Sequence, residues 1–498
     1  IFYNPKQPLD GQIVLAAPRD IAPGVKDPYY ISSIAMVWEP LIDVDKNGQI
    51  EGRLSTAWES SADFKVWTFK LRQGVYFHDE TPFNADAVLA NIERWKAMGR
   101  RNSTFYAFDI NSIYPNLIEV KKIDDYTVQF LFEKSMPMLV ERMIRFGSPI
   151  FSPKCFNKIT GDFTGIAQGT GPFKILENNT GNSVILIKNE KYYGEKSKSK
   201  KIIIRNIPNA STRYSALKAE EIYGVVDIGA MPPSLTKALL QDNRFAITLN
   251  KNSINQQILI NQSKWPLSDK RFIQALNLII NREVVVENYF NGQAQPNNNL
   301  LNNISPYYIA RPLYYDAVKA KKLSKEVVGD LVIPMEFLIP EYGLSRYSYK
   351  EIAEYLQSVF SDINIELHIQ ILDGAAHKKL LTQGAYDFSI GTQGLPDYRP
   401  ESILEPYMAS DGRVNQLYHL NYKNDRANQL FNQLKNSLDL NQRNSIYQEL
   451  QMIATEDPPV LTLANDYSAL IYNKKLCGYE ATTYGITLNK IQWSENSD

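Results

Sequence analysis

The side chains best suited to catalysis or metal binding are few in this chain, and they do not form a known catalytic set. Its four histidines, His78, His368, His377 and His419, stand far apart, and only two cysteines occur. No His/Cys cluster has the spacing of a zinc site. The motifs Gly-x-Ser-x-Gly and His-Glu-x-x-His are both absent. We therefore expect that the chain is not an enzyme.

Composition indicates a soluble globular protein of more than one domain. The chain has 498 residues, too many for one ordinary core, with 44% hydrophobic and 22% charged residues. Lys+Arg and Asp+Glu both number 54, so that the net charge is zero and no nucleic-acid partner is expected. No apolar run is long enough to span a membrane. The first residues are interpreted as a mature or trimmed start without a signal peptide.

The stretch from Trp38 to Trp95 has the strongest local patterns. Alternation of apolar and polar residues over 67–72 predicts a half-buried strand. The turn residues at 45–48 predict a hairpin in which Asn47-Gly48 supplies the positive φ values. Asn84 is placed to cap a helix that ends near Met98, because apolar residues recur after it at helical spacing.

Other segments extend this mixture of helices and strands. Gly169-Thr170-Gly171 is weak evidence for phosphate binding, since no Walker lysine accompanies it. Periodicity and capping residues predict strands at 13–16, 127–132 and 365–369, and helices at 31–38, 272–280, 352–359 and within 425–456. An α/β protein with a layered sheet is expected.

Several motifs together resemble a known family. Trp38-Glu39-Pro40-Leu41, the segment Trp67–Asp79, Pro82-Phe83-Asn84 and Gly169–Phe173 are similar to motifs of bacterial extracellular solute-binding proteins of family 5. These proteins serve ABC importers of dipeptides, oligopeptides and nickel. The resemblance implies a periplasmic-binding-protein-like two-lobed clamshell, of the type II large cluster C form, with an extra subdomain in the first lobe.

The same resemblance implies the domain limits. Residues 1–245 are expected to form the first lobe, with the inserted subdomain at about 42–165. Residues 246–466 are expected to form the second lobe, and residues 467–498 to return to the first. Ligands of such hinged proteins bind between the lobes.

Arginines are the first candidates for ligand binding. In nickel-binding relatives, one arginine after the helix that ends near Met98 receives a chelator carboxylate, and Arg100 and Arg101 share this role here. Arg145 lies one residue from the position of a second such arginine. The planar guanidinium suits this task because it bonds both carboxylate oxygens. The alternatives are a solvated helix end for Arg100 and Arg101, and a surface arginine beside an apolar face for Arg145.

A second group of candidates follows from the resemblance. Asp397 corresponds to an aspartate that pairs with the α-ammonium in peptide-binding relatives, although it could be an ordinary turn residue. His419 is a candidate metal ligand, displaced by several residues from the ligand histidine of nickel relatives. The further candidates for lining the ligand site are Tyr30, Phe146, Gln393, Tyr398 and Tyr484.

Two ligand classes remain open. The short segment 148–156 resembles the nickel branch, whereas Asp397 and the lack of an aligned loop histidine favour a peptide. We favour nickel as the transported ligand, bound with an organic chelator such as histidine, and expect no catalytic cofactor. A periplasmic monomer that delivers its ligand to an ABC permease in the inner membrane is expected.

Overall fold

A computed structural model of the chain describes residues 12–24, 32–99 and 108–494. The chain divides into two compact units. Unit 1 comprises Ile1–Met231, Leu235–Asn250 and Ser468–Asp498, and unit 2 comprises Pro232–Ser234 and Lys251–Tyr467. The long strands β13 (Phe245–Ile260) and β18 (Val460–Asn473) each contain a point at which the chain passes from one unit to the other. The assignment of the units as lobes of a clamshell stays a prediction.

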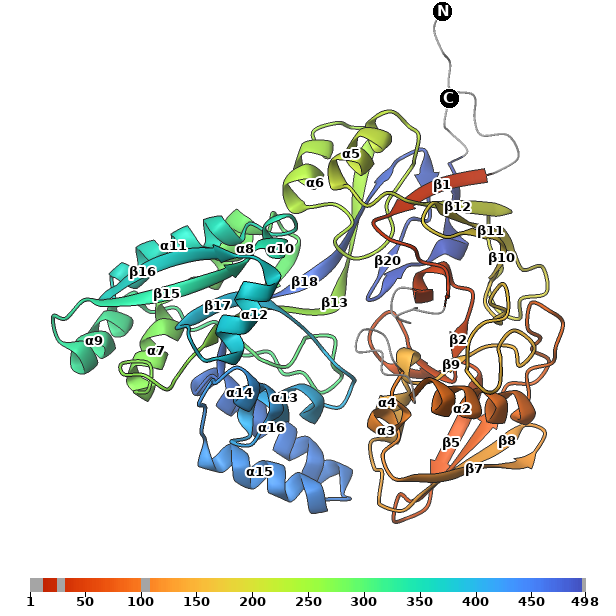
Figure 1. The fold of residues 1–498 in the computed structure, drawn as a ribbon, viewed down its shortest axis with the longest axis horizontal. Helices are drawn as coiled ribbons and strands as arrows, with labels where there is room; N and C mark the ends of the chain where they lie inside the picture. The colour runs from red at the N-terminus through yellow and green to blue at the C-terminus, as the bar shows by residue number, and fades with distance from the viewer. Residues whose placement is uncertain (1–11, 25–31, 100–107, 495–498) are drawn as a thin grey trace, which may run out of the picture. The chain divides into compact units, whose positions relative to one another are not determined.

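One sheet of unit 1 joins segments that are distant in sequence (Figure 1). Its order is β1-β12-β11-β10, and β1 pairs with β12 in parallel while the other pairs are antiparallel. The strands are β1 (Gln12–Ala17), β10 (Phe173–Asn179), β11 (Ser183–Lys188) and β12 (Lys201–Asn206). The strand predicted at 13–16 is confirmed as part of β1.

A second sheet of unit 1 is antiparallel and packs against α2 (Ala85–Gly99) (Figure 1). Asn84 caps this helix as predicted, since its Oδ1 accepts a hydrogen bond of 3.1 Å from the Ala87 amide. Trp95 is fully buried and stacks on Phe108 and Tyr114, with centroid distances of 5.0 and 5.6 Å. In the sheet order β5-β6-β8-β7, the strands are β5 (Ser55–Ser60), β6 (Val66–Leu71), β7 (Leu117–Asp124) and β8 (Thr127–Phe132).

The hairpin of β3 (Ile42–Val44) and β4 (Ile50–Gly52) corrects one prediction. Only Gly48 of the Asn-Gly pair has a positive φ, at +78°, so the prediction was wrong for Asn47. Asp45 Oδ1 accepts hydrogen bonds from the backbone amides of Asn47 (2.8 Å) and Gln49 (2.9 Å). This side-chain turn closes the loop with a single left-handed residue.

The helix predicted at 31–38 is wrong in its second half. Ser32 is helical and is followed by the 3-10 turn η2 (Ser33–Ala35), which ends where Met36 takes a left-handed conformation with φ +53°. Trp38 turns back on this segment, because its indole N–H donates to Ser32 Oγ at 2.9 Å. Apolar spacing alone could not distinguish this tight turn from a longer helix.

The glycines of Gly169-Thr170-Gly171 are explained by close packing of the backbone. A Cβ atom on Gly169 would lie 2.0 Å from the carbonyl oxygen of Val37, and one on Gly171 would lie 2.1 Å from that of Met36. His78 fixes the same turn, since its Nε2 lies 2.9 Å from the Gly171 oxygen and its Nδ1 accepts from the Gly169 amide. The glycines of this turn therefore have a structural role, and the turn gives no further support for phosphate binding.

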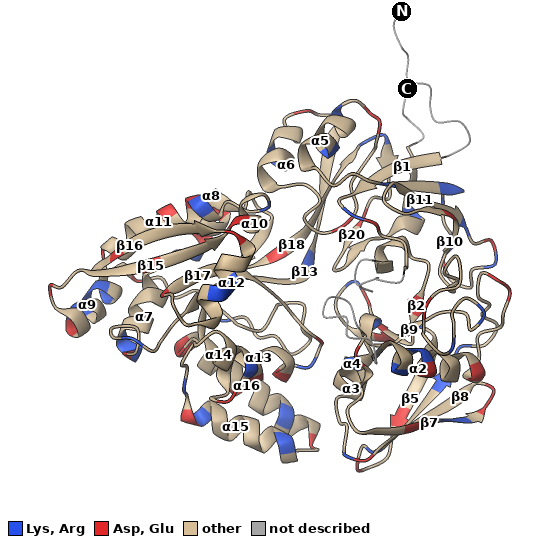
Figure 2. Cartoon of the chain, viewed as in Figure 1, with Lys and Arg blue, Asp and Glu red and all other residues tan. Residues whose placement is uncertain are grey.

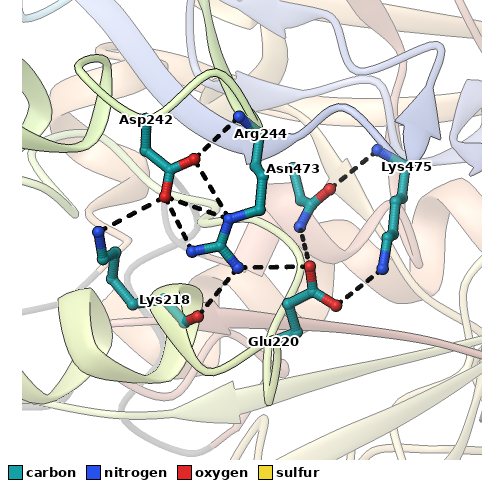
Figure 3. Close-up of polar contacts among 6 residues, drawn as sticks. All are labelled: Lys218, Glu220, Asp242, Arg244, Asn473 and Lys475. Carbon is teal, nitrogen blue, oxygen red and sulfur yellow. Dashed lines mark hydrogen bonds and ion pairs between the residues drawn. The ribbon is translucent and has the colours of Figure 1, made fainter. Parts of the chain in front are cut away.

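A network of charged groups anchors, within unit 1, the strands that lead to unit 2 (Figure 3). Glu220, which follows α5 (Ala210–Lys218), pairs with Lys475 at 2.8 Å and with Arg244 at 3.5 Å. Arg244, just before β13, forms hydrogen bonds to Asp242. Asn473, the last residue of β18, also donates to Glu220. The start of β13 and the end of β18 are thus held at one place.

The remaining elements of unit 1 are short. They are β2 (Glu39–Pro40) paired with β9 (Pro149–Ile150), β19 (Leu476–Cys477) paired with β22 (Gln492–Trp493), β20 (Ala481–Thr482) paired with β21 (Gly485–Ile486), α3 (Ile110–Ile113), α4 (Leu139–Met143), η3 (Arg145–Gly147) and η4 (Leu488–Lys490). Helix α6 (Pro233–Leu239) spans a boundary between the units.

Unit 2 is built on a mixed six-stranded sheet with the order β14-β18-β13-β17-β15-β16. The strands not yet given are β14 (Ala294–Pro296), β15 (Ile333–Pro340), β16 (Ile365–Leu372) and β17 (Phe388–Gly394). The helices are α7 (Lys270–Ile279), α8 (Arg282–Tyr289), α9 (Ala317–Val328), α10 (Glu341–Leu344), α11 (Tyr349–Ser361), α12 (Gly374–Thr382), α13 (Glu401–Met408), α14 (Arg413–Leu417), α15 (Asp425–Asn436) and α16 (Leu440–Glu456). The helix predicted at 352–359 and the strand predicted at 365–369 are confirmed as parts of α11 and β16, whose apolar faces join one core.

Acidic and basic residues are interspersed along the elements of both units (Figure 2). This distribution agrees with the net charge of zero. Among the residues that the structure describes, no helix combines the length and apolar character needed to cross a bilayer.

A buried carboxylate in unit 2 leads to a prediction about pH. Asp466 of β18 accepts hydrogen bonds from the Gln256 amide (2.9 and 3.1 Å) and from the Tyr347 hydroxyl (3.2 Å). Burial raises the pKa of Asp466 from 3.8 to about 6, and these hydrogen bonds together with the charge of Arg346 only partly oppose the change. The folded protein therefore takes up a proton between about pH 6 and pH 4 that the unfolded chain does not.

We expect the contribution of Asp466 to the free energy of unfolding to fall as pH rises through this window. Asp466→Asn should remove this dependence and stabilise the protein at pH 7 by on the order of 2 kcal/mol. Urea unfolding of parent and variant at pH 5 and pH 7.5 measures the effect, with the exposed Asp362→Asn as control. Equal pH dependence of parent and Asp466→Asn would contradict this prediction.

Candidate functional site

A cavity of about 600 Å³ lies within unit 1. Its walls come from the β3–β4 hairpin, from η3, from the loop Tyr192–Glu195 and from the segment between β20 and η4. Three arginines, Arg53, Arg72 and Arg145, line it together with aromatic side chains. Its size and its mixture of aromatic and polar groups are typical of a small-molecule site.

Two of the predicted site residues, Arg145 and Tyr484, line this cavity, and a third, Phe146, packs against Tyr484. The guanidinium carbon of Arg145 lies 5.1 Å from the centroid of the Tyr484 ring, and Phe146 packs edge-to-face on the same ring at 4.8 Å. Contact between a cation and an aromatic face stabilises the arginine and holds its plane. Arg145, Phe146 and Tyr484 thus form one cluster.

The backbone around Arg145 is unusual. Arg145 has φ +50°, a left-handed conformation that is uncommon for a residue with a side chain. The next turn is closely packed, because a Cβ atom on Gly147 would lie 1.9 Å from the Arg142 oxygen. Ser148 closes it with hydrogen bonds to the Met143 oxygen and from the Leu41 amide. Tertiary packing therefore sets the direction of the Arg145 side chain.

Asp43 holds the inner edge of the Arg145 side chain. Arg145 Nε lies 3.2 Å from Asp43 Oδ1, and the other carboxylate oxygen of Asp43 lies 3.5 Å from Arg53 Nη2. Asp43 is buried, with 3% of its surface exposed. Neither Nε nor the Nη atoms of Arg145 form a hydrogen bond with any residue that the structure describes, so its contact with Asp43 is an ion pair alone. Arg145 is thus paired with Asp43 on its Nε side, and its outer edge can bind a carboxylate.

Arg53 belongs instead to an internal charge network. It approaches Glu51 at 2.9 Å and Glu39 at 3.9 Å, besides Asp43. Burial raises the pKa of the Glu39 carboxyl, although the charge of Arg53 opposes this. Burial alone would lower the pKa of Arg53, but the charges of Asp43 and Glu39 raise it above its usual value. Arg53 is therefore neutralised by its own carboxylates.

The predicted site residues of unit 2 make contacts of their own. Asp397 accepts two hydrogen bonds from the Arg399 guanidinium, at 3.0 and 2.9 Å. Gln393 accepts a hydrogen bond from the Tyr407 hydroxyl at 2.7 Å, and Tyr398 is buried. An ammonium ligand at Asp397 would have to compete with Arg399.

His419 is exposed and its Nε2 lies 2.7 Å from the Thr382 oxygen. Over residues 12–24, 32–99 and 108–494, no three His, Cys, Asp or Glu side chains are grouped so as to hold a metal ion. Tyr30, Arg100 and Arg101 lie outside the described residues.

The sequence analysis missed the roles of Arg72, which lines the cavity, and of Asp43, which pairs with Arg145. Arg72 and Asp43 both lie within the Trp38–Trp95 stretch, where strand periodicity was assigned without a role for these charges. A signal was available for Arg72, because it is the charged residue directly after the buried end of a strand. Asp43 carried no such signal, since its partner at the candidate site, Arg145, lies far away in sequence.

Comparison with protein families gives a match over most of the chain. The model of bacterial extracellular solute-binding proteins, family 5 Middle, matches residues 49–415. The probable D,D-dipeptide-binding periplasmic protein of Escherichia coli K12 is 24% identical over 88% of this chain and 83% of its own length. The nickel-binding periplasmic protein of the same strain is 26% identical over 63% of this chain and 60% of its own length.

Comparison with solved structures gives the fold. The crystal structure of NikA from Brucella suis in complex with Fe(III)-EDTA has a TM-score of 0.81 and 20% identity, and the match covers 97% of this chain and all of that one. The predicted fold class, α/β and periplasmic-binding-protein-like, is confirmed.

Proposed function

Because the chain belongs to the bacterial extracellular solute-binding proteins of family 5, and is the solute-binding protein of an ABC importer, we propose that it captures nickel as a small-molecule chelate. The observation that supports this proposal is Arg145, which lies against Asp43 and Tyr484 and has an outer edge that can bind a carboxylate of the ligand. Capture between two hinged lobes, which the family resemblance implies, stays a prediction.

The donor set supports a chelate rather than a bare ion. Nickel prefers nitrogen and oxygen ligands in fixed geometry, and in the part of the chain described no cluster of protein ligands could provide them. A chelator such as histidine would fill the coordination sphere, and the protein would bind its carboxylates. NikA from Brucella suis, with the same fold, is seen with another metal chelate, Fe(III)-EDTA.

A di- or oligopeptide is the second candidate ligand. It is supported by the D,D-dipeptide-binding relative, whose similarity covers more of this chain than that of the nickel-binding relative does. The pairing of Asp397 with Arg399 weighs against it, because the carboxylate expected to bind the α-ammonium already has a cation. The carboxyl terminus of a peptide could still bind Arg145.

Other parts of the proposal follow from the family. Relatives are named as periplasmic, and we propose the same location for this chain. We also propose that it acts as a monomer without a catalytic cofactor and delivers its ligand unchanged to a permease of the inner membrane. Family members are substrate-binding transport proteins.

Isothermal titration calorimetry separates the two ligands. We expect heat when nickel and free histidine are added together, little heat with nickel alone, and none with a panel of di- and tripeptides. Heat with peptides and none with nickel chelates would favour a peptide as the ligand instead of a nickel chelate. Chemical turnover of any ligand would contradict the proposal of a binding protein.

A further inference from the structure

Arg72 differs from the other arginines of the cavity in its partners. It directly follows β6, and its Nε donates a hydrogen bond of 2.8 Å to the carbonyl oxygen of Arg53. Its guanidinium carbon lies 5.1 Å from the centroid of the Tyr193 ring. No carboxylate of a described residue lies within ion-pair distance of it, whereas Arg53 faces three and Arg145 faces one.

The setting of Arg72 repeats that of Arg145. Each guanidinium lies over a tyrosine ring, Tyr193 or Tyr484. The Nε atom of Arg72 donates a hydrogen bond, whereas that of Arg145 lies at ion-pair distance from Asp43 without a hydrogen bond. The Tyr193 ring is itself fixed, because its hydroxyl donates to the buried carboxylate of Glu39 at 2.9 Å. In both arginines the Nη atoms form no hydrogen bond with the part of the chain described. Each side chain is therefore already ordered for binding an anion through these atoms.

A continuous series of contacts connects the two arginines. Arg72 bonds the backbone of Arg53, the Arg53 side chain pairs with Asp43, and Asp43 pairs with Arg145. Because every member is part of unit 1 and lines or adjoins one cavity, the spacing between the two guanidinium groups is fixed by this framework.

We propose that Arg72, positioned over the Tyr193 ring, forms a second anion subsite, which binds one carboxylate of a ligand whose other carboxylate binds Arg145. This inference rests on the proposed function, since it takes the cavity as the ligand site. The ligand class is thereby narrowed to small molecules with at least two carboxylates. A nickel complex with two histidines belongs to this class, and so does a dipeptide with an acidic side chain.

Two pairs of probes of matched shape test the subsite. The first pair is nickel with histidine and nickel with histidine methyl ester, and the second is the dipeptides Ala-Glu and Ala-Gln. Calorimetry of the parent, Arg72→Gln, Arg72→Lys and Arg145→Gln gives their affinities. Arg205→Gln is the control variant, because Arg205 is 43% exposed and does not line the cavity.

One member of each probe pair carries an additional carboxylate. In whichever pair the parent binds, we expect Arg72→Gln to lower the affinity for this member by about 10- to 100-fold. The affinity for the other member should fall by less than about threefold. Arg72→Lys should recover part of the loss, because it keeps the charge without the planar fork. Arg145→Gln should weaken binding of any probe that carries a carboxylate. Arg205→Gln should weaken binding of neither member of a pair.

The outcomes separate the two proposals. If Arg145→Gln weakens binding and Arg72→Gln does not, the second subsite is wrong and the proposed function stands. If Arg72→Gln weakens both members of a pair equally, its role is structural and the subsite is also wrong. If neither variant changes affinity, or the parent binds no probe, the cavity is not the ligand site and both proposals fail.

Discussion

Replacement of Arg145 by glutamine is expected to weaken binding of the nickel–histidine complex by about 100-fold or more. Loss of one partner of a desolvated, hydrogen-bonded charge pair typically costs about 2–5 kcal/mol, because the other charge is left unpaired. Arg145 is held for this contact by Asp43 at 3.2 Å and by the Tyr484 ring at 5.1 Å. Calorimetric titration of the parent and the variant at one ionic strength measures the change.

Two further variants sharpen this test. Arg145→Lys should have an intermediate affinity, since lysine offers a point charge instead of a planar fork. Arg142→Gln, three residues earlier, is the matched control, because Arg142 does not line the cavity and donates to the Ser112 oxygen. The site assignment would be wrong if Arg145→Gln bound the complex as the parent does while melting at the same temperature.

Replacement of Arg443 by methionine is expected to destabilise unit 2 by about 3–5 kcal/mol, the usual cost of removing one partner of a buried ion pair. Arg443 Nη2 lies 2.7 Å from Glu401 Oε1, and the two side chains are only 7% and 10% exposed. Arg443 Nη1 also donates to the carbonyl oxygens of Leu434 and Ser437, and Nη2 to the Tyr447 hydroxyl. Methionine would fill much of the space but take away the hydrogen bonds that Arg443 donates to these acceptors and its ion pair with a buried carboxylate.

Helix α16 also offers a matched control for this prediction. Arg426 of α15 pairs with Glu449 of α16 at 2.6 Å, but these side chains are 48% and 41% exposed. Arg426→Met should cost less than about 1 kcal/mol, because water screens an exposed pair. Urea unfolding followed by circular dichroism compares both variants with the parent. Similar unfolding midpoints for Arg443→Met and Arg426→Met would contradict the prediction.

Local patterns predicted the elements well where one physical signal dominated. Strict alternation over 67–72 corresponds to β6, and Asn84 followed by apolar residues at helical spacing corresponds to α2. The segment 31–38 had apolar residues without a decisive period, and there a 3-10 turn replaced the expected helix. At Asn47, the hydrogen bonds of Asp45 decided the turn, a competition that spacing does not reveal.

The candidate site was predictable only in part. The family motifs led to Arg145, Phe146 and Tyr484, which the structure places in one cluster. They also led to Asp397, but the sequence did not show that Arg399, two residues away, binds its carboxylate. The sequence did not indicate that Arg72 belongs to a site, because its tyrosine partner, Tyr193, lies far along the chain.

The amino-acid sequence by itself determined the family, the α/β fold class and the residue types available for binding, since these depend on local periodicity and on ordered motifs. Only the tertiary structure decided which arginines are neutralised and which present a free edge to the cavity. The physical reason is that a guanidinium acts through its nearest charges and ring faces, and long-range packing brings these from segments that are remote in sequence.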